Sequence, residues 1–270
     1  MDLNDPFGSS CQDKGIRRGD TLIDTGLIER YAARAWPADE AREEGGWLLR
    51  HTPGVPRRRS NSALPLGRGE SLLSAVPRVE EYYAAHGLPV TVQVSPAEEH
   101  SALDELLAAR GYRRDSAVLV CTAPTDTVIA AARPATPLDV TLAEHPTPAW
   151  LDAYAALDPA GSDREAAERL FERIPGPAAH LGVERDGRLV GLGLVVAAPG
   201  CGGVFCMITD PAYRRQGVAG AILHVGARWA AARGAELLYL QVTADNAPAR
   251  RLYESLGFGV SHSYHYRLKP

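Results

Sequence analysis

The spacing of apolar residues divides the chain into helices and strands that alternate along most of its length. Apolar residues three and four positions apart predict a helix, and apolar residues at every second position predict a strand. The expected helices are 22–38, 74–85, 101–110, 148–157, 162–174, 218–232 and 247–256. The expected strands are 46–51, 60–66, 90–94, 116–122, 139–143, 181–185, 189–197, 203–209, 237–242 and 260–268.

Turn-forming residues predict how some of these elements are connected. Asp186-Gly187 joins two alternating segments and is the strongest hairpin signal in the chain. Ser162 is expected to cap the helix that follows it. The basic run Pro56-Arg57-Arg58-Arg59 is interpreted as the solvated tip of a hairpin, with anion or partner binding as the alternative.

The order of the elements predicts an α+β fold, with helices layered on a sheet, in more than one part. Residues 1–20 are polar and are expected to form a flexible leader. Residues 123–138 are rich in Ala, Pro and Thr and are interpreted as a linker. A smaller lobe over 21–122 and a main domain over 139–270 are therefore expected.

The two halves also resemble each other weakly. Leu103–Val120 and Arg251–Leu268 share the order helix, Gly-aromatic, strand, and His86-Gly87 precedes a strand as Arg233-Gly234 does. The similarity indicates either an internal duplication or a chance likeness between helix-turn-strand units. If it is a duplication, the first copy has lost its glycine turn and serves a structural or substrate-shaping role.

Composition narrows the class of protein. The 270 residues are 45% hydrophobic, and the net charge of −4 with a pI near 6.1 gives no electrostatic reason to bind nucleic acid or an anionic membrane. No apolar run is long enough to span a bilayer, and no secretory signal is present, so a cytoplasmic location is expected. Only Lys14 and Lys269 are lysines, and this arginine-biased, alanine-rich usage suggests a GC-rich bacterial genome.

The cysteines give no sign of a metal site. Their spacing contains no CxxC pair, so free thiols are expected and no metal is predicted. The four are Cys11, Cys121, Cys201 and Cys206.

A glycine-containing turn before the helix at 218–232 carries the first sign of chemistry. Asp210-Pro211 ends the preceding strand, and the turn Arg214–Gly220 then opens the helix. The first N–H groups of a helix have no partner within it, and the helix dipole places partial positive charge there, so a phosphate is favoured at this point. Alone, this pattern indicates anion binding and nothing more specific.

Residues on both sides of the helix at 218–232 make the signal of the glycine turn more specific. The entry Asp-Pro-x-Tyr-Arg-Arg-Gln-Gly is followed, after one helix and one strand, by Asn246 and by the block Leu252–Phe258 (LYESLGF). The segment Thr209–Phe258 thereby resembles the GNAT superfamily of acyl-CoA N-acyltransferases, specifically over residues 203–264 and by element order from about 139. The resemblance implies a mixed, mostly antiparallel sheet flanked by helices, with a smaller, degenerate GNAT-like lobe before it, and acetyl-CoA as the cosubstrate.

The resemblance also implies roles for residues. The pantetheine arm of CoA would pair with the backbone of Met207, Ile208 and Thr209, and Asn246 would contact the CoA arm, cap the following helix, or both. Tyr253 matches the general acid that protonates the sulfur as it leaves, and Leu107 stands at the equivalent position of the first half. The pyrophosphate would lie on the N–H groups of Arg215, Gln216, Gly217, Val218, Ala219 and Gly220.

The general base is left unnamed. Gln241 stands where many family members carry a glutamate, and an amide cannot usefully accept a proton. Water could deprotonate the amine instead. Other side chains that could face the amine are Glu144, His145, Asp163, Asp210, His262 and His265. Cys206 is interpreted as a buried small hydrophobe, because no neighbouring base that would activate it is evident.

The expected function is N-acetylation of a primary amine, on a small molecule or a protein, by direct attack in a ternary complex. The alternative is a non-catalytic acyl-CoA-binding regulator. One cofactor site per chain is expected, and the monomer and the homodimer both stay open. Two groups have either an acceptor-binding or a purely structural interpretation: the acids Asp158, Asp163, Glu165 and Glu168, and the final-strand residues His262, Tyr264, His265 and Tyr266.

Overall fold

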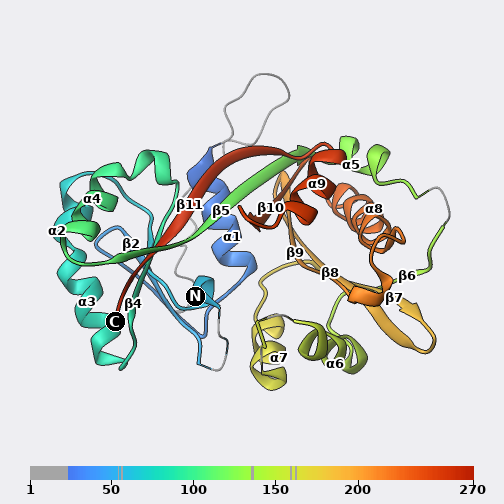
Figure 1. Ribbon diagram of the computed structural model, residues 1–270, viewed down its shortest axis with the longest axis horizontal. Coiled ribbons are helices and arrows are strands. Elements are labelled where there is room, and N and C mark those ends of the chain that lie inside the picture. The colour runs from blue at the N-terminus through green and yellow to red at the C-terminus, as the bar shows by residue number, and fades with distance from the viewer. Residues whose placement is uncertain (1–23, 54, 56, 135–136, 159, 162) are drawn as a thin grey trace.

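One eight-stranded sheet runs through both halves of the molecule, and helices pack on both of its faces (Figure 1). The computed structural model describes residues 24–53, 55, 57–134, 137–158, 160–161 and 163–270. The expected leader 1–20 and the expected cap Ser162 therefore lie outside the described residues. The strand order is β4-β11-β5-β10-β9-β8-β7-β6, and a separate three-stranded sheet has the order β1-β2-β3.

The elements follow the expected order closely. The strands are β1 (Glu40–Glu44), β2 (Trp47–His51), β3 (Leu64–Pro65), β4 (Val90–Val94), β5 (Arg113–Pro124), β6 (Val140–Ala143), β7 (Ala178–Arg185), β8 (Arg188–Ala198), β9 (Cys201–Thr209), β10 (Leu237–Thr243) and β11 (Gly259–Lys269). The helices are α1 (Thr25–Ala35), α2 (Glu70–Ser74), α3 (Val76–Ala85), α4 (Ser101–Ala109), α5 (Thr125–Ala131), α6 (Pro148–Leu157), α7 (Arg164–Glu172), α8 (Val218–Ala231) and α9 (Ala247–Ser255). Three short 3-10 helices are η1 (Arg58–Ser60), η2 (Ala97–Glu99) and η3 (Pro211–Tyr213).

Strand pairing is mostly antiparallel, as expected. Within the large sheet only β9 and β10 pair in parallel, and the other neighbours pair antiparallel. At the predicted β7–β8 hairpin, Asp186 and Gly187 have φ of 54° and 74°, as a turn with two left-handed central residues requires. The predicted mixed sheet flanked by helices is therefore confirmed.

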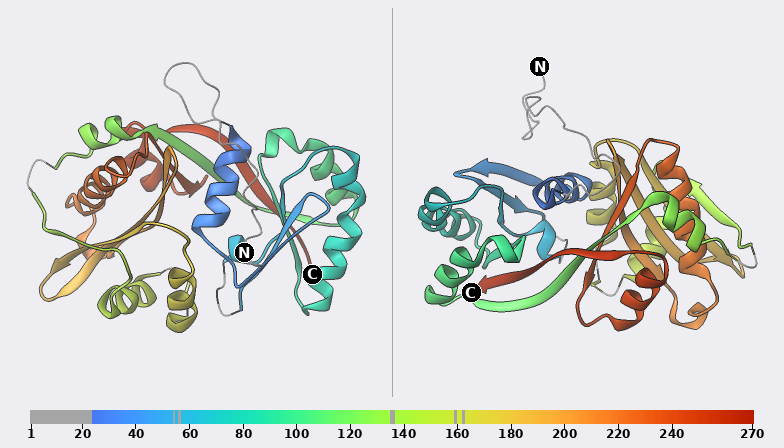
Figure 2. Two further views of the ribbon diagram at one scale, coloured as in Figure 1. Left: turned by 180° about the vertical axis from the view of Figure 1, so that it is seen from behind. Right: turned by 90° about the horizontal axis from the view of Figure 1, so that it is seen from above.

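The long strands β5 and β11 cross from one lobe to the other and pair with each other over most of their length (Figures 1 and 2). The end of β11, from His265 to Lys269, pairs with β4 in the first lobe. The end of β5, from Val118 to Pro124, pairs with β10 in the second lobe. In the sheet, β11 of the second half therefore lies between β4 and β5 of the first half. Likewise, β5 of the first half lies between β11 and β10 of the second half.

The internal similarity seen in the sequence extends to backbone hydrogen bonds. Helices α3 and α8 end alike: Gly87 and Gly234 both have positive φ, and the next residue donates to the fifth residue back along the helix. Helices α4 and α9 also share this ending, at Gly111 and Gly257. The equivalent bonds are Leu88 N to Tyr83 O, Ala235 N to Ala230 O, Tyr112 N to Leu107 O and Phe258 N to Tyr253 O.

The segment expected to be a linker is partly folded. Strand β5 continues to Pro124, and α5 occupies Thr125–Ala131. Val128 of α5 is fully buried in the apolar cluster that includes α8, and His224 of α8 is hydrogen-bonded through Nδ1 to the Ile129 carbonyl at 3.0 Å. Burial of one apolar side chain per turn therefore favours a helix where composition alone favoured a loop.

Residues 57–59 of the basic run do not form a solvated hairpin tip, which corrects the expectation for them, and Pro56 lies outside the described residues. Residues 58–60 form η1, and only Leu64–Pro65 of the expected strand 60–66 is a strand. Arg57 and Arg59 are half-buried, with their guanidinium carbons 5.7 Å from the ring centroids of Trp36 in the first lobe and Phe205 in the second, respectively.

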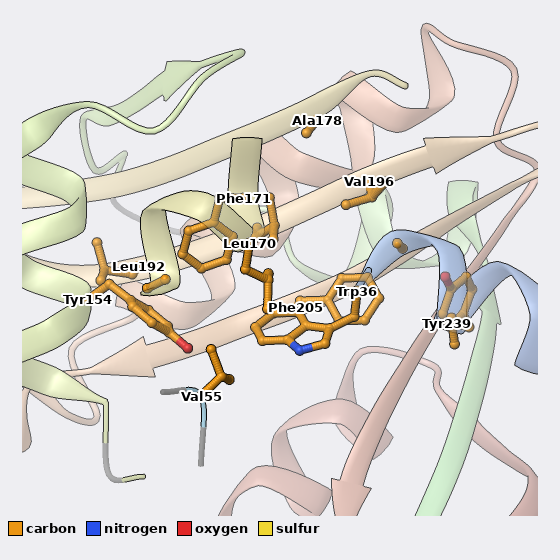
Figure 3. Close-up of a cluster of buried hydrophobic side chains, with 14 of the residues drawn as sticks. Trp36, Val55, Tyr154, Leu170, Phe171, Ala178, Leu192, Val196, Phe205 and Tyr239 are labelled. Carbon is orange, nitrogen blue, oxygen red and sulfur yellow. The ribbon is translucent and has the colours of Figure 1, made fainter. Parts of the chain in front are cut away.

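Of the apolar clusters in the core, the two largest lie on opposite faces of the large sheet. One contains Trp36 of α1 and Phe205 of β9, with ring centroids 6.0 Å apart, among residues of α6 and α7 (Figure 3). The other contains residues of α5, α8 and α9. Gly191 and Gly193 of β8 bring α8 close to the sheet, because a Cβ there would stand 2.2 Å from Val218 Cγ1 and 2.4 Å from Ile222 Cγ2.

This close approach predicts the effect of one added methyl group. Gly193→Ala should lower the free energy of unfolding by about 1–3 kcal/mol, because the fully buried Ile222 must move away from the new Cβ. Gly259→Ala is the matched control, since a Cβ there meets open space. Urea unfolding followed by circular dichroism measures both changes, and equal stability of the two variants would show that α8 does not depend on this contact.

Candidate active site

The strands β9 and β10 separate at one point, and the candidate site lies there. Their last parallel pair is Val204 with Leu240. Beyond it β9 stays paired with β8 to Thr209, whereas β10 stays paired with β5 to Thr243. A register shift in the β8–β9 ladder falls at Cys206, whose φ of 50° turns the strand locally. The residues that the resemblance assigns to the pantetheine arm, Met207 to Thr209, begin directly after this point.

Met207, Ile208 and Thr209 line one side of this gap. Ile208 and Thr209 pair with Leu192 and Gly191 of β8 on the opposite edge. Because Asp210 N donates to a carbonyl of β8, alternation along the strand directs the N–H of Thr209 away from β8 and into the gap. Among the described residues, no strand pairs with this edge of the backbone, as pairing with the pantetheine arm requires.

The turn before α8 has the geometry of an anion cradle. Arg215 and Gly217 have φ of 64° and 81°, and the first helical hydrogen bond runs from Ala221 N to the Gly217 carbonyl. The N–H groups of Val218, Ala219 and Gly220 precede this bond and have no acceptor within the helix. A Cβ built at Gly217 or Gly220 meets no atom within 4 Å, so the cradle is open to a ligand.

Asp210 holds this turn and is therefore not available as a base. Its Oδ1 accepts from Ala212 N at 2.9 Å and its Oδ2 accepts from Arg188 Nη1 at 2.8 Å. The Ala212 N–H first, and the Arg188 guanidinium second, lower the pKa of Asp210. Tyr213 donates to Asp186 Oδ2 at 2.9 Å, which links the turn to the β7–β8 hairpin.

Asn246 caps α9 and Tyr253 lies on it, after the strand β10 that forms the other side of the gap. Asn246 Oδ1 accepts from Ala249 N at 3.2 Å, so the capping role is present, and contact with CoA stays a prediction. Tyr253 is 8% exposed, and burial raises the pKa of its hydroxyl to about 12. Among the described residues that hydroxyl has no hydrogen-bond partner, so its proton is free for a ligand.

Most of the other suggested bases are occupied elsewhere. Glu144 binds Arg233, Asp163 caps α7, and His265 binds Asp104, whereas His145 is exposed. His262 Nε2 is hydrogen-bonded to the buried Glu29 at 2.8 Å.

His262 nevertheless shares a sheet face with Gln241. Both residues pair with Val120 of β5, and two strand spacings put their backbones roughly 10 Å apart. Gln241 itself accepts a hydrogen bond from the Tyr264 hydroxyl at 2.9 Å through Oε1. The structure therefore brings no ionisable base into the gap from the described part of the chain.

Cys206 lies at the register shift beside the gap but is not activated. Burial raises the pKa of its thiol to about 12, although Arg57 and Arg59 lie near enough to oppose that rise. A thiol with this pKa is almost wholly protonated at neutral pH and is a poor nucleophile. Burial raises the pKa of Cys121 and Cys201 as well.

One group of three side chains in the described residues has the spacing of metal ligands. It consists of Glu40, His51 and His86, with Glu40 Oε2 and His86 Nε2 3.3 Å apart. A cavity of about 1310 Å³ adjoins it, lined by residues of α1, β1 and α3. The three side chains belong to the first lobe, and Arg173 and Pro175 of the second lobe also line the cavity. Both features lie on other elements than the gap and the turn.

Comparisons with known proteins show the family to which the chain belongs. Residues 24–267 match the family described as "Probable histone acetyltransferase Rv0428c C-terminal". The chain is 29% identical to an uncharacterized N-acetyltransferase, YobR, of Bacillus subtilis, over 92% of this chain and all of that protein. It is 30% identical to a mycothiol acetyltransferase of Thermomonospora curvata, over 90% of this chain and 80% of that protein.

A solved structure shows the same fold. The GCN5-related N-acetyltransferase of Kribbella flavida superposes with a TM-score of 0.69 at 18% identity, over 93% of this chain and 97% of that one. In the described part of this chain, no helix is long and apolar enough to cross a membrane.

The thiol beside the gap gives a test of direct attack. Cys206→Ala should retain turnover within about twofold of wild type, because a thiol with so high a pKa supplies no thiolate nucleophile. Release of free CoA from acetyl-CoA measures the rate, and intact-mass spectrometry checks for an acetylated protein. An acetyl adduct on Cys206, or loss of turnover in the variant, would instead show a covalent intermediate.

Proposed function

Because the chain belongs to this acetyltransferase family, and with it to the GNAT superfamily of acyl-CoA-dependent N-acetyltransferases, we propose that it transfers an acetyl group from acetyl-CoA to a primary amine by direct attack in a ternary complex. The observation that carries the proposal is the divergence of β9 and β10 directly before the open turn at the start of α8. An extended acyl-CoA can lie in the gap between the two strands and place its phosphates on the turn at the start of α8.

The proposed position of acetyl-CoA follows from these two features. Its pyrophosphate accepts hydrogen bonds from the free N–H groups of Arg215 through Gly220, where the dipole of α8 also favours negative charge. Its pantetheine arm pairs with the backbone from Met207 to Thr209, as an added strand would. Asn246 contacts the arm from α9, and the thioester lies beside Phe205, Cys206 and Gln241, where the two strands separate.

The reaction requires one bond to form and one to break. The neutral amine nitrogen attacks the thioester carbonyl, the carbonyl carbon–sulfur bond breaks, and the amine proton leaves through water. Tyr253 donates its hydroxyl hydrogen toward the departing sulfur. Thiols have a pKa near 8.5, so a hydroxyl with a pKa of about 12 stabilises the thiolate chiefly as a hydrogen-bond donor.

The names of the relatives support two kinds of acceptor. The family description names a histone acetyltransferase, and the Thermomonospora curvata protein is named for mycothiol. We propose a small-molecule amine over a protein amine, because the residues beside the gap include aromatic rings and arginines packed closely together. A groove that admits a protein segment would require them to stand apart.

Removal of the Tyr253 hydroxyl should separate catalysis from binding. In Tyr253→Phe, kcat should fall about 100-fold, the lower part of the range for a positioned acid, with the Kd for CoA unchanged. Stopped-flow or steady-state CoA release gives kcat, and isothermal titration calorimetry gives Kd. Tyr82→Phe, on a half-buried tyrosine of α3 in the first lobe, is the control.

The pH profile tests the same residue. Since the pKa of Tyr253 is about 12, the hydroxyl keeps its proton up to about pH 11, and kcat should show no descending limb from Tyr253 below that pH. A descending limb between pH 7 and 10 that disappears in Tyr253→Phe would contradict this. Intact CoA binding with no turnover on any amine would instead favour a non-catalytic acyl-CoA sensor.

A further inference from the structure

The turn at residues 57–60 belongs to the first lobe but packs against the second. Arg57 forms an ion pair with the buried Asp158 and donates to the Tyr154 hydroxyl at 3.3 Å. Arg58 donates to Asp115 Oδ2 at 2.7 Å, at the start of β5. Two of the three arginines thus have a carboxylate partner, which neutralises their charge within the fold.

Arg59 differs from its neighbours in having no carboxylate. Its guanidinium carbon stands 5.7 Å from the centroid of the Phe205 ring, and although burial lowers the pKa of the guanidinium, the hydroxyls of Tyr264 and Tyr266 lie near enough to raise it. Among the described residues, no acidic group lies within ion-pair distance of it. Because a desolvated charge without a counter-ion is costly, Arg59 is a cation prepared for an anion from outside the chain.

Arg59 also stands where an acceptor must enter. Phe205 and Gln241 are the first residues beyond the last β9–β10 pair. By alternation along the strands, both side chains lie on the face away from α8, where Phe205 packs with Trp36. Arg59 covers Phe205 on that face, so a nucleophile that approaches the thioester from there passes its guanidinium.

A second unpaired donor lies in the same place. The Tyr264 hydroxyl donates to Gln241 Oε1, which leaves the buried Nε2 of Gln241 without an acceptor among the described residues. A buried amide N–H without a partner costs about 1–3 kcal/mol. The Arg59 guanidinium and the Gln241 amide therefore both present N–H donors beside the gap, and no acceptor among the described residues is bonded to the Nε2 of Gln241.

We propose that Arg59, with Gln241, binds an anionic group that the acceptor carries close to its amine, so that the acceptor is an α-amino acid or an aminoalkyl phosphate. The planar guanidinium fits either oxyanion through paired N–H donors. The assignment rests on the proposed acetyl transfer and names the class of its acceptor. The assignment also implies a function for the degenerate first lobe, because that lobe supplies Arg59, the side chain that determines acceptor specificity.

The acids that could have attracted a cationic amine are used otherwise. Asp158 is bound to Arg57, Asp163 Oδ1 caps α7 at Ala166 N, and Glu168 binds Arg164 at 3.0 Å. Glu165 is exposed on α7. The side chains next to the gap are consequently positive on balance, which disfavours a polyamine.

A panel of matched acceptors tests the proposal. Glycine is compared with glycinamide, and phosphoethanolamine with ethanolamine, at equal concentrations of neutral amine, with spermidine as the cationic member. Wild-type kcat/KM should favour one anionic member over its neutral partner by roughly 10- to 100-fold, and the favoured pair identifies a carboxylate or a phosphate. Equal rates within both pairs, or spermidine as the best substrate, would overturn the proposal.

Substitutions in the turn test whether Arg59 causes the preference for an anionic acceptor. Arg59→Gln should raise KM for the anionic acceptor by roughly 10- to 100-fold and leave the neutral partner and the Kd for CoA unchanged, and Arg59→Lys should recover part of the loss. Arg58→Gln, from the same turn, is the control and should change KM by no more than about twofold. An equal fall in kcat for charged and neutral acceptors would assign Arg59 to the thioester or to folding, and would overturn the proposal.

A binding measurement keeps the proposal distinct from the acetyl-transfer assignment. N-acetylglycine and N-acetylglycinamide are titrated by calorimetry into protein saturated with CoA. Tighter binding of the carboxylate, lost in Arg59→Gln, supports the anion site even if no amine is turned over. Turnover of neutral amines without any such preference would retain the acetyltransferase and overturn the anion site.

Discussion

The backbone ladder between β5 and β11 is the interaction on which the rest of the structure depends. It pairs residues from Arg113 to Thr122 with residues from Leu268 back to Gly259. Strand β11 also pairs with β4 in the first lobe, and β5 also pairs with β10 in the second. Two lobes joined by a flexible segment would move as separate bodies, whereas a shared sheet fixes their relation through many hydrogen bonds. The position of Arg59 against Phe205 is a consequence of that fixed relation.

A buried polar network strengthens the same junction. Glu29 of α1 binds His262 of β11 and accepts from Gln93 of β4, and Gln93 in turn accepts from the fully buried Arg50 of β2. Breaking such a network by removal of one member leaves a buried charge or donor without a partner. The network therefore holds α1, and with it Trp36, against the second lobe.

Local signals made much of the fold predictable. The β7–β8 hairpin, α6 and α8 were set by their own turn residues and periodicity, and the glycine turn with Tyr253 was recognisable by spacing. Strand β1 was missed because Glu40–Glu44 is almost entirely charged, and α5 because its segment has the composition of a loop. The role of the arginine run depends on Trp36 and Phe205, whose proximity no local pattern contains.

The strand exchange also sets the order in which the molecule can be completed during synthesis. Strand β4 is made early but pairs with β11, whose residues emerge after every other described element. The first lobe consequently leaves the ribosome with an open sheet edge, an exception to the usual rule that N-terminal units finish folding first. Pairs so far apart along the chain close slowly, and an unpaired edge strand invites pairing with other chains. During synthesis this edge therefore stays open to wrong partners until β11 arrives.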